Sequence, residues 1–272
     1  KVRGGINLIS QLSEQERRRG VITASTGNHG QSVAYASKLF AVKATVLLPE
    51  HANPDKVESM RALGADVIFH GKDFEESRIY AENLAKEKAY RYIHAANEPD
   101  LIAGVGTMAL EIVEDLPDVD AIIVPIGGGT EAAGTSIVAK TLRPSIKVIA
   151  VQAEGAPSFY LSWKEGRIVE TPSVKTMADG LATRRAFELT LEIFKDLLDD
   201  FVLVSDDEIR YAIKLLLNKT HNLAEGAGAA STAAAVKLKD RLKGLRVALV
   251  LSGGNLTMEA LKAVLNEQAF QD

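Results

Sequence analysis

The sequence contains no cysteine, which excludes disulfide bonds, zinc–thiolate sites and thiol nucleophiles. It has no apolar run near the roughly 20 residues of a membrane-spanning helix, and it shows no secretory signal peptide. Neither sign of charge dominates, because 32 basic and 36 acidic residues leave a net charge of −4. This balance argues against nucleic acid as the main partner. We therefore expect a soluble protein of the cytoplasm that binds neither membranes nor nucleic acid.

What the sequence does contain is an ordinary globular composition. Of its 272 residues, 46% are hydrophobic and 25% are charged, a balance that supports a large core without covalent staples. The length corresponds to one large domain or two ordinary ones. The chain begins at Lys1 with no initiator methionine, so we expect that a segment upstream of it is absent.

Hydrophobic segments of strand length alternate with apolar-periodic helical segments along the chain. This alternation predicts an α/β fold with parallel sheets covered by helices. We expect two lobes, a small α/β domain of residues 20–97 and a larger α/β domain of residues 1–19 plus 98–272. The predicted strands are 21–25, 44–49, 66–70, 91–95, 121–126, 147–152, 201–204 and 246–251, and the predicted helices are 31–40, 54–63, 74–88, 101–115, 132–142, 185–198, 209–218 and 227–239, with a last helix after Asn255.

Three loops rich in glycine and small polar residues directly follow predicted strands, at residues 25–30, 127–130 and 252–255. In parallel α/β sheets, ligands bind beyond the carboxyl ends of the strands. Glycines let the backbone approach a ligand closely, and N–H groups at a helix N-terminus attract anions. The triple glycine at 127–129 has the spacing of neither a Walker loop nor a dinucleotide-binding turn. Taken alone, each loop could equally be a tight packing turn.

Together these loops resemble those of the fold-type II pyridoxal-phosphate enzymes, the tryptophan synthase β type, and in particular the threonine/serine dehydratase and serine racemase branch. KVRGG at residues 1–5 resembles the end of the family's Ser-Phe-Lys-x-Arg-Gly-Ala motif, and STGNH at 25–29 resembles its Ser-x-Gly-Asn-His loop. The resemblance covers essentially the whole chain and implies pyridoxal 5'-phosphate as the cofactor. Further motifs follow in family order at 102–107, 124–129, 178–180, 225–229 and 252–255.

The resemblance also implies catalytic roles near the start of the chain. Lys1 would be the Schiff-base lysine and the base at the substrate Cα, whereas a solvated terminal lysine is the alternative. Ser25 would bind the substrate carboxylate, and Thr26 aligns with a racemase serine. Asn28 would hydrogen-bond the ring hydroxyl of the cofactor.

The remaining cofactor contacts would come from the later motifs. The turn at 127–130 would hold the phosphate, and Ser252 would face the pyridine nitrogen. Glu225 resembles a glutamate that lies close to the cofactor, with a simple charge at a helix N-terminus as the alternative. The cofactor-binding residues that the resemblance implies are Lys1, Asn28, Gly127, Gly128, Gly129, Thr130, Gly180, Glu225 and Ser252.

The activity implied is that of a dehydratase, or ammonia-lyase, that eliminates the β-hydroxyl of a threonine- or serine-type amino acid to give a 2-keto acid and ammonia. An amino-acid racemase is the alternative among enzymes, because Thr26 offers a hydroxyl on the face opposite Lys1. A non-catalytic protein that binds an amino acid or the cofactor is the alternative outside them. We expect a homodimer or a larger homo-oligomer.

Two departures from the family pattern bear on the site. Where many dehydratases have His-Pro followed by an aromatic residue or Asn, this chain has HAAN at 94–97, and small Ala96 suggests a wider pocket. The divalent-cation site of metal-dependent members is matched only by Glu154, since Ser158 and Tyr160 stand at the other positions. We therefore predict that no metal is required.

Overall fold

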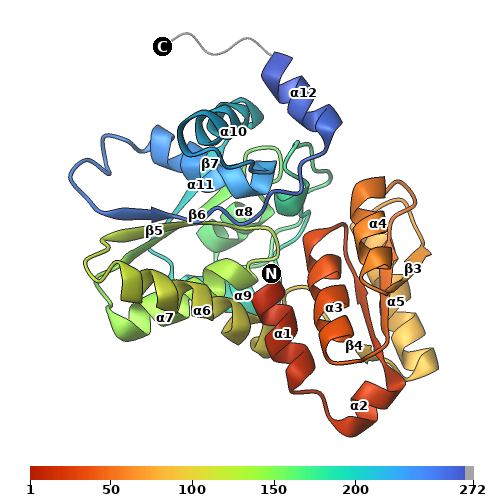
Figure 1. The fold of residues 1–272 in the computed structure, drawn as a ribbon. Coiled ribbons are helices and arrows are strands. Elements are labelled where there is room, and N and C mark those ends of the chain that lie inside the picture. Colours follow the sequence, from red (N-terminus) through yellow and green to blue (C-terminus); the bar gives the residue numbers. More distant parts are fainter. Residues whose placement is uncertain (267–272) are drawn as a thin grey trace. The chain divides into compact units, whose positions relative to one another are not determined.

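The computed structural model describes residues 1–266, which form two compact units, residues 1–105 and the residues from 106 onward. Each unit is built on one four-stranded sheet (Figure 1), and every strand pairing within the two sheets is parallel. The predicted α/β fold with parallel, helix-covered sheets is therefore confirmed. None of the helices within residues 1–266 combines the length and the apolar character that crossing a membrane requires.

The sheet of the first unit has the strand order β3-β2-β1-β4. Neighbouring residues on its strands point to opposite faces. Val21 and Val46 pack with α1, α3 and α4 on one face, whereas Ile22 and Leu47 pack with α5 on the other. The elements of this unit are α1 (Val2–Ser10), α2 (Glu14–Arg19), β1 (Val21–Ala24), α3 (Asn28–Leu39), β2 (Ala44–Leu48), α4 (Pro54–Ala62), β3 (Asp66–Phe69), α5 (Phe74–Lys88), β4 (Arg91–Tyr92) and the first part of α6 (Pro99–Asp115).

The sequence analysis predicts no helix before residue 20, whereas the structure has α1 and α2 there. Gly4 and Gly5 are poor helix formers, yet both lie within α1. A Cβ on Gly4 would lie 2.8 Å from Leu101 O, and one on Gly5 would lie 2.4 Å from Ser32 Oγ. Glycine is therefore required for the close packing of α1 on α3 and α6, and this long-range constraint is invisible in local periodicity.

The compact units have a different boundary from the lobes that the sequence analysis draws. Leu8 and Leu101 lie outside residues 20–97, and both belong to the same buried cluster as Val21 and Val33. The first and last segments of residues 1–105 thus share one core with the strands between them.

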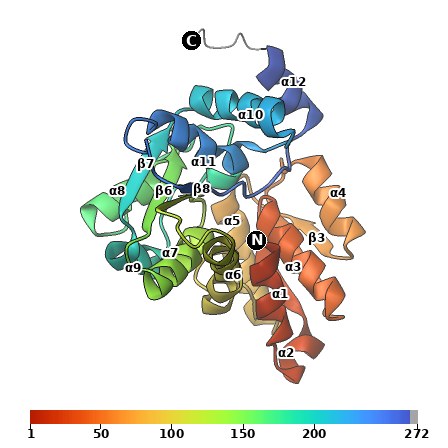
Figure 2. The same cartoon turned by 60° about the vertical axis from the view of Figure 1, so that its left-hand side comes forward.

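The sheet of the second unit has the strand order β7-β6-β5-β8. Helices α7 and α9 lie on one side of this sheet, and α10 and α11 lie on the other (Figures 1 and 2). The alanine-rich helix α11 is buried over most of its length, because small side chains let it lie directly against the strands. The elements of this unit are β5 (Ala121–Pro125), α7 (Thr130–Leu142), β6 (Lys147–Ala153), α8 (Ser158–Glu165), the 3-10 helix η1 (Asp179–Leu181), α9 (Glu188–Leu197), β7 (Asp200–Val204), α10 (Asp206–Thr220), α11 (Gly226–Lys237), β8 (Val247–Leu249) and α12 (Met258–Asn266), with the rest of α6.

Helices begin where the sequence carries start signals. The Asn53 side chain accepts hydrogen bonds from the first turn of α4, and Pro54 is the first helical residue. Ser205 and Glu208 form a reciprocal capping box at the start of α10. These side chains satisfy N–H groups that a helix leaves without backbone partners.

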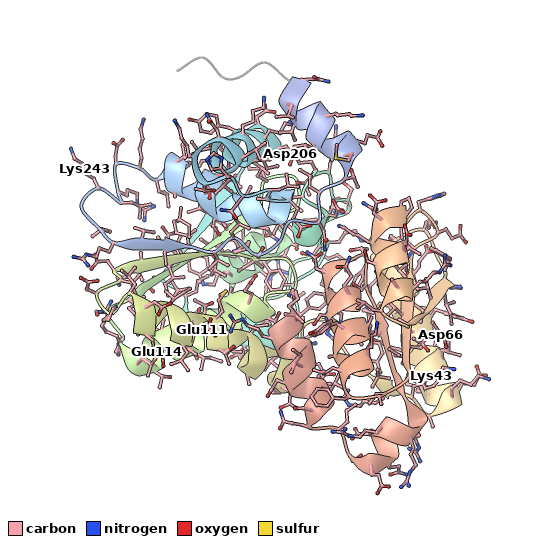
Figure 3. All side chains as sticks on the ribbon, in the orientation of Figure 1. Lys43, Asp66, Glu111, Glu114, Asp206 and Lys243 are labelled. Carbon is pink, nitrogen blue, oxygen red and sulfur yellow. The ribbon has the colours of Figure 1, made fainter. Side chains whose placement is uncertain are left out.

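Two ion pairs of the first unit differ in what they contribute to stability. Lys43 and Asp66 are 3.1 Å apart on the surface (Figure 3), where solvent screens the pair. Glu98 is buried and receives two hydrogen bonds from the Arg91 guanidinium, at 2.9 and 2.8 Å. Hydrogen bonding to Glu98 raises the pKa of Arg91. The Arg91–Glu98 pair therefore fixes the start of β4 to the residue that precedes α6.

Replacing Arg91 with Met should lower the free energy of unfolding by about 3 kcal/mol, because it leaves a buried carboxylate without its counter-charge. The double variant Arg91→Met/Glu98→Gln should recover much of this loss, since it removes the uncompensated charge. Urea unfolding of the wild type and both variants measures the difference. A loss below 1 kcal/mol in Arg91→Met, or no recovery in the double variant, would contradict this account.

Candidate functional site

The 25–30 loop, which joins β1 to α3, is folded around the hydroxyl of Ser25. Ser25 Oγ accepts hydrogen bonds from the N–H groups of Gly27 at 3.0 Å and Gly30 at 2.8 Å, and the side chain is buried. A hydroxyl has two acceptor lone pairs and one proton. These two bonds leave Ser25 its O–H proton to offer, which suits a carboxylate oxygen.

Helix α3 begins at Asn28 with Gly27 as its N-cap, one turn earlier than the predicted helix 31–40. The N–H groups of this first turn attract negative charge. A buried lysine of α4 adds to that attraction, since a Cβ on Gly27 would lie 3.2 Å from Lys56 Nζ. Thr26, beside the N-cap, is half-buried. The first turn of α3 is therefore electrostatically suited to an anion.

His29 is buried next to this loop and hydrogen-bonds to Thr23. Its Nε2 lies 2.9 Å from Thr23 Oγ1, whose own proton is donated to Ile93 O at 2.8 Å. Nε2 must therefore carry the ring proton and donate it. Burial lowers the pKa of His29 to about 3, and the positive charge of Lys1 adds to this effect. His29 is thus a neutral imidazole at physiological pH.

Lys1 lies at the N-cap of α1 and is held against α3. Ser32 Oγ of α3 donates a hydrogen bond to Lys1 O at 2.7 Å. The Lys1 charge also acts on His29, which follows directly after Asn28. The first unit therefore brings Lys1 to the same end of α3 as the 25–30 loop.

The 94–97 turn after β4 is closed by the imidazole of His94. Its Nδ1 accepts hydrogen bonds from the N–H groups of Ala96 and Asn97, both at 2.9 Å. A nitrogen that accepts two such bonds carries no proton, so the other ring nitrogen holds the single proton of the neutral ring. Ala96 is completely buried.

In the second unit, the triple glycine connects β5 to α7. Helix α7 begins at Thr130, and its N-cap Gly129 has a φ of +89°, which favours glycine. A side chain at Gly127 is excluded, because a Cβ there would lie 2.0 Å from Gly180 O. The turn thus combines glycine backbone with a helix N-terminus, as phosphate-binding turns do.

Gly180 lies in η1. The residues just before η1 are bound by the carboxylate of Asp206, which stands at the start of α10 (Figure 3). Asp206 accepts hydrogen bonds from Thr176 Oγ1 at 2.6 Å and from Met177 N at 3.0 Å. This carboxylate therefore fixes the segment that packs on Gly127.

Glu225 and the 252–255 loop meet through the backbone. Glu225 N donates to Gly253 O at 3.1 Å, and a Cβ on Gly228 would lie 2.3 Å from the same oxygen. Glu225 is the buried N-cap of α11, but its side chain makes no capping hydrogen bond. Ser252 is half-buried on this loop. The start of α11 and the loop that carries Ser252 therefore lie side by side in the second unit.

The carboxylate of Glu154 forms an ion pair with the ammonium group of Lys237. Lys237 Nζ lies 3.3 Å from Glu154 Oε1 and 3.1 Å from Glu208 Oε2, and it donates to Leu203 O at 2.9 Å. Within residues 1–266, no group of three or more His, Asp or Glu side chains is arranged to hold a metal ion.

The structure divides the predicted site residues between its units. Lys1, Ser25, Thr26 and Asn28 belong to the first unit, and the others belong to the second. The sequence analysis missed two supporting residues, Lys56 and Asp206. Only Lys56 had a local signal of burial in the sequence. It stands four positions before Met60 and so lies on the same, buried face of α4.

Comparison with known proteins shows the family to which the chain is similar. The sequence profile of the family described as "Pyridoxal-phosphate dependent enzyme" matches residues 1–253. L-threonine ammonia-lyase of Thermotoga maritima is 42% identical over 267 residues, which cover 98% of this chain and 66% of that relative. The chain thus spans 66% of the length of this curated relative.

Two solved structures are similar to this chain in both fold and sequence. The processed form of threonine deaminase isoform 2 from Solanum lycopersicum has a TM-score of 0.92 and 36% identity, covering 97% of this chain and 73% of that one. Maize serine racemase has a TM-score of 0.91 and 32% identity, covering 97% and 82%.

The buried imidazole of His29 makes stability depend on pH. The unfolded chain binds a proton at this residue near pH 6.5, whereas the folded chain binds it only near pH 3. The stabilisation is therefore complete above pH 6.5 and is lost as the pH falls towards 3. Between pH 7.0 and 5.5, wild type should lose about 1.3 kcal/mol more unfolding free energy than His29→Gln. Urea unfolding at the two pH values tests this, and equal losses would contradict it.

Proposed function

Because the chain belongs to the family of pyridoxal-phosphate dependent enzymes, we propose that it is an ammonia-lyase for threonine- or serine-type amino acids. The observation that carries the proposal is the 42% identity to an L-threonine ammonia-lyase over 98% of this chain. The substrate would be a small 3-hydroxy amino acid, and the products a 2-keto acid and ammonia. We also propose that the protein is cytoplasmic and works as a homodimer or larger homo-oligomer.

Pyridoxal 5'-phosphate is the cofactor of this family, and the second unit fits its phosphate. Gly127 has no room for a side chain, and Gly129 has a φ of +89° that favours glycine. The turn before α7 is therefore bare backbone. Backbone N–H groups at a helix N-terminus are the donors that a phosphate dianion prefers. We assign the phosphate to Gly127, Gly128, Gly129 and Thr130.

Other second-unit residues would contact the rest of the cofactor. Gly180 lies against the proposed phosphate turn, and Glu225 N is hydrogen-bonded to Gly253 O in the loop that carries Ser252. A serine hydroxyl facing the pyridine nitrogen does not keep that nitrogen protonated as a carboxylate would. This moderates electron withdrawal by the ring and suits β-elimination.

When bound, the cofactor withdraws electrons from the substrate Cα and so acidifies its proton. Lys1 would supply the amine that holds the cofactor and then accepts this proton. The O–H of Ser25 and the first turn of α3, with Lys56 beside it, would orient the substrate carboxylate. Asn28 would bind the ring hydroxyl. The β-hydroxyl would leave as water, and one water would be consumed in the hydrolysis that yields the 2-keto acid and ammonia. The overall conversion therefore balances.

A racemase is the second candidate. Maize serine racemase, at 32% identity and a TM-score of 0.91, favours it. Racemisation needs a second proton donor besides Lys1, on the opposite face of the substrate. The half-buried hydroxyl of Thr26 is the candidate for that donor.

Replacing Lys1 with Ala should lower keto-acid formation more than about 100-fold, since it removes the base. Borohydride reduction of the wild type should fix the cofactor on Lys1 Nζ, and the variant should yield no adduct. Fragment mass spectra distinguish Nζ from an amino terminus. An adduct on another lysine would contradict the assignment.

Replacing Thr26 with Ala separates the two candidate activities. Keto-acid formation from the L-substrate should remain within about threefold of wild type, because elimination needs only the Lys1 base. Any racemisation, and any elimination from the D-substrate, should be lost. Chiral chromatography and a keto-acid assay measure both. If elimination from the L-substrate fell as far as in Lys1→Ala, Thr26 would be a primary catalytic residue and the racemase would become the better candidate.

A further inference from the structure

A buried hydroxyl on α9 is hydrogen-bonded to the backbone of the glycine turn. Thr190 is completely buried, and its Oγ1 lies 3.2 Å from Gly128 O and 3.3 Å from Phe187 O. The single hydroxyl proton is therefore shared between these two carbonyl oxygens. The bond to Gly128 joins residues 62 positions apart in sequence.

Thr190 also fills the space behind the next glycine. A Cβ on Gly129 would lie 3.0 Å from both Cβ and Oγ1 of Thr190, and 3.1 Å from Phe194 Cζ. Thr190 and Phe194 stand four residues apart, so they share one face of α9. This face backs the glycine turn with one polar group and one aromatic ring.

The hydrogen bond determines how one peptide unit is oriented. In a trans peptide, the C=O of one residue and the N–H of the next point in opposite directions. Holding Gly128 O towards α9 therefore turns the N–H of Gly129 away from α9. Glycine has few steric limits on its torsion angles, so the turn's own sequence does little to prevent this peptide from rotating.

A second hydroxyl lies near the preceding peptide. Thr183 Oγ1 is 3.5 Å from Gly127 O, a longer and weaker contact than that of Thr190. Because Gly127 C=O and Gly128 N–H belong to one trans peptide, this contact would turn the Gly128 N–H away from Thr183. Both side chains come from the segment that follows η1, not from the turn itself.

We infer that Thr190 is a positioning residue of the phosphate site. Its hydroxyl fixes the Gly128–Gly129 peptide so that the Gly129 N–H is directed at the phosphate of the cofactor. This inference rests on the proposed assignment of the phosphate to residues 127–130. It predicts that Thr190 affects affinity for the phosphate group and not for the pyridine ring.

The test compares two ligands that differ only in the phosphate, pyridoxal phosphate and pyridoxal. Their affinities for cofactor-free protein are measured by the absorbance of the bound ligand. Thr190→Val keeps the side-chain shape and removes the hydroxyl. It should weaken pyridoxal phosphate about tenfold, the effect of one charge-assisted hydrogen bond, and leave pyridoxal within twofold. The ³¹P resonance of bound pyridoxal phosphate should also shift.

Two variants control for the loss of a methyl group and of an unrelated hydroxyl. Thr190→Ser keeps the donor and should bind both ligands within about threefold of wild type. Thr171→Val removes a hydroxyl that donates to Arg184 O at 3.2 Å and not to a carbonyl of the glycine turn, and it should change neither affinity. If Thr190→Val does not fold, Thr190→Cys is measured in its place. Its weak thiol donor should give a smaller loss that is still confined to pyridoxal phosphate.

Equal weakening of both ligands, or of neither, by the Thr190 variant would overturn the positioning role. Gly128→Val tests the underlying phosphate assignment separately. It should weaken pyridoxal phosphate by more than the Thr190 variant does. If Gly128→Val leaves the affinity for pyridoxal phosphate unchanged in folded protein, the assignment of the phosphate to this turn fails as well. If only the Thr190 variant is silent, the assignment stands and the inference alone is wrong.

Discussion

Direct packing of backbone on backbone at Gly127 is the constraint on which the second unit depends. Gly180 O occupies the position that a Cβ on Gly127 would need. Gly180 in turn leaves room for Ala227, since a Cβ on Gly180 would lie 2.8 Å from the Cβ of that residue. The end of β5, η1 and the start of α11 therefore stack without large side chains between them. The glycine turn at residues 127–129 owes its shape to this stack and to the hydroxyl of Thr190.

The first unit solves a different problem, which is to keep polar groups buried without unwanted charge. Ser25 satisfies two N–H groups of its own loop and retains a proton to donate. His29 is held neutral by burial and hydrogen-bonds to Thr23, so it adds no charge near Lys1. Lys1 and Lys56 supply positive charge at this end of α3, and this charge would suit an anion.

Much of the fold could be read from the sequence because its signals are local. Alternating strand and helix periods predicted both parallel sheets, and α4 begins at Pro54 as the sequence predicts. The missed features depend on partners far away in the chain. Helix α1 needs glycines because of contacts with α3 and α6, and Thr190 acts on Gly128 across 62 positions. A single sequence contains no periodic signal for such contacts.

The most direct test of this account is a titration of cofactor-free Gly127→Ala with pyridoxal phosphate. If backbone packing on Gly180 shapes the phosphate site, the added methyl must displace η1 or the turn, because no Cβ approaches an oxygen at 2.0 Å. The affinity should then fall more than about tenfold, the effect of losing at least one charge-assisted hydrogen bond. An unchanged affinity with an unchanged circular dichroism spectrum would contradict the central claim.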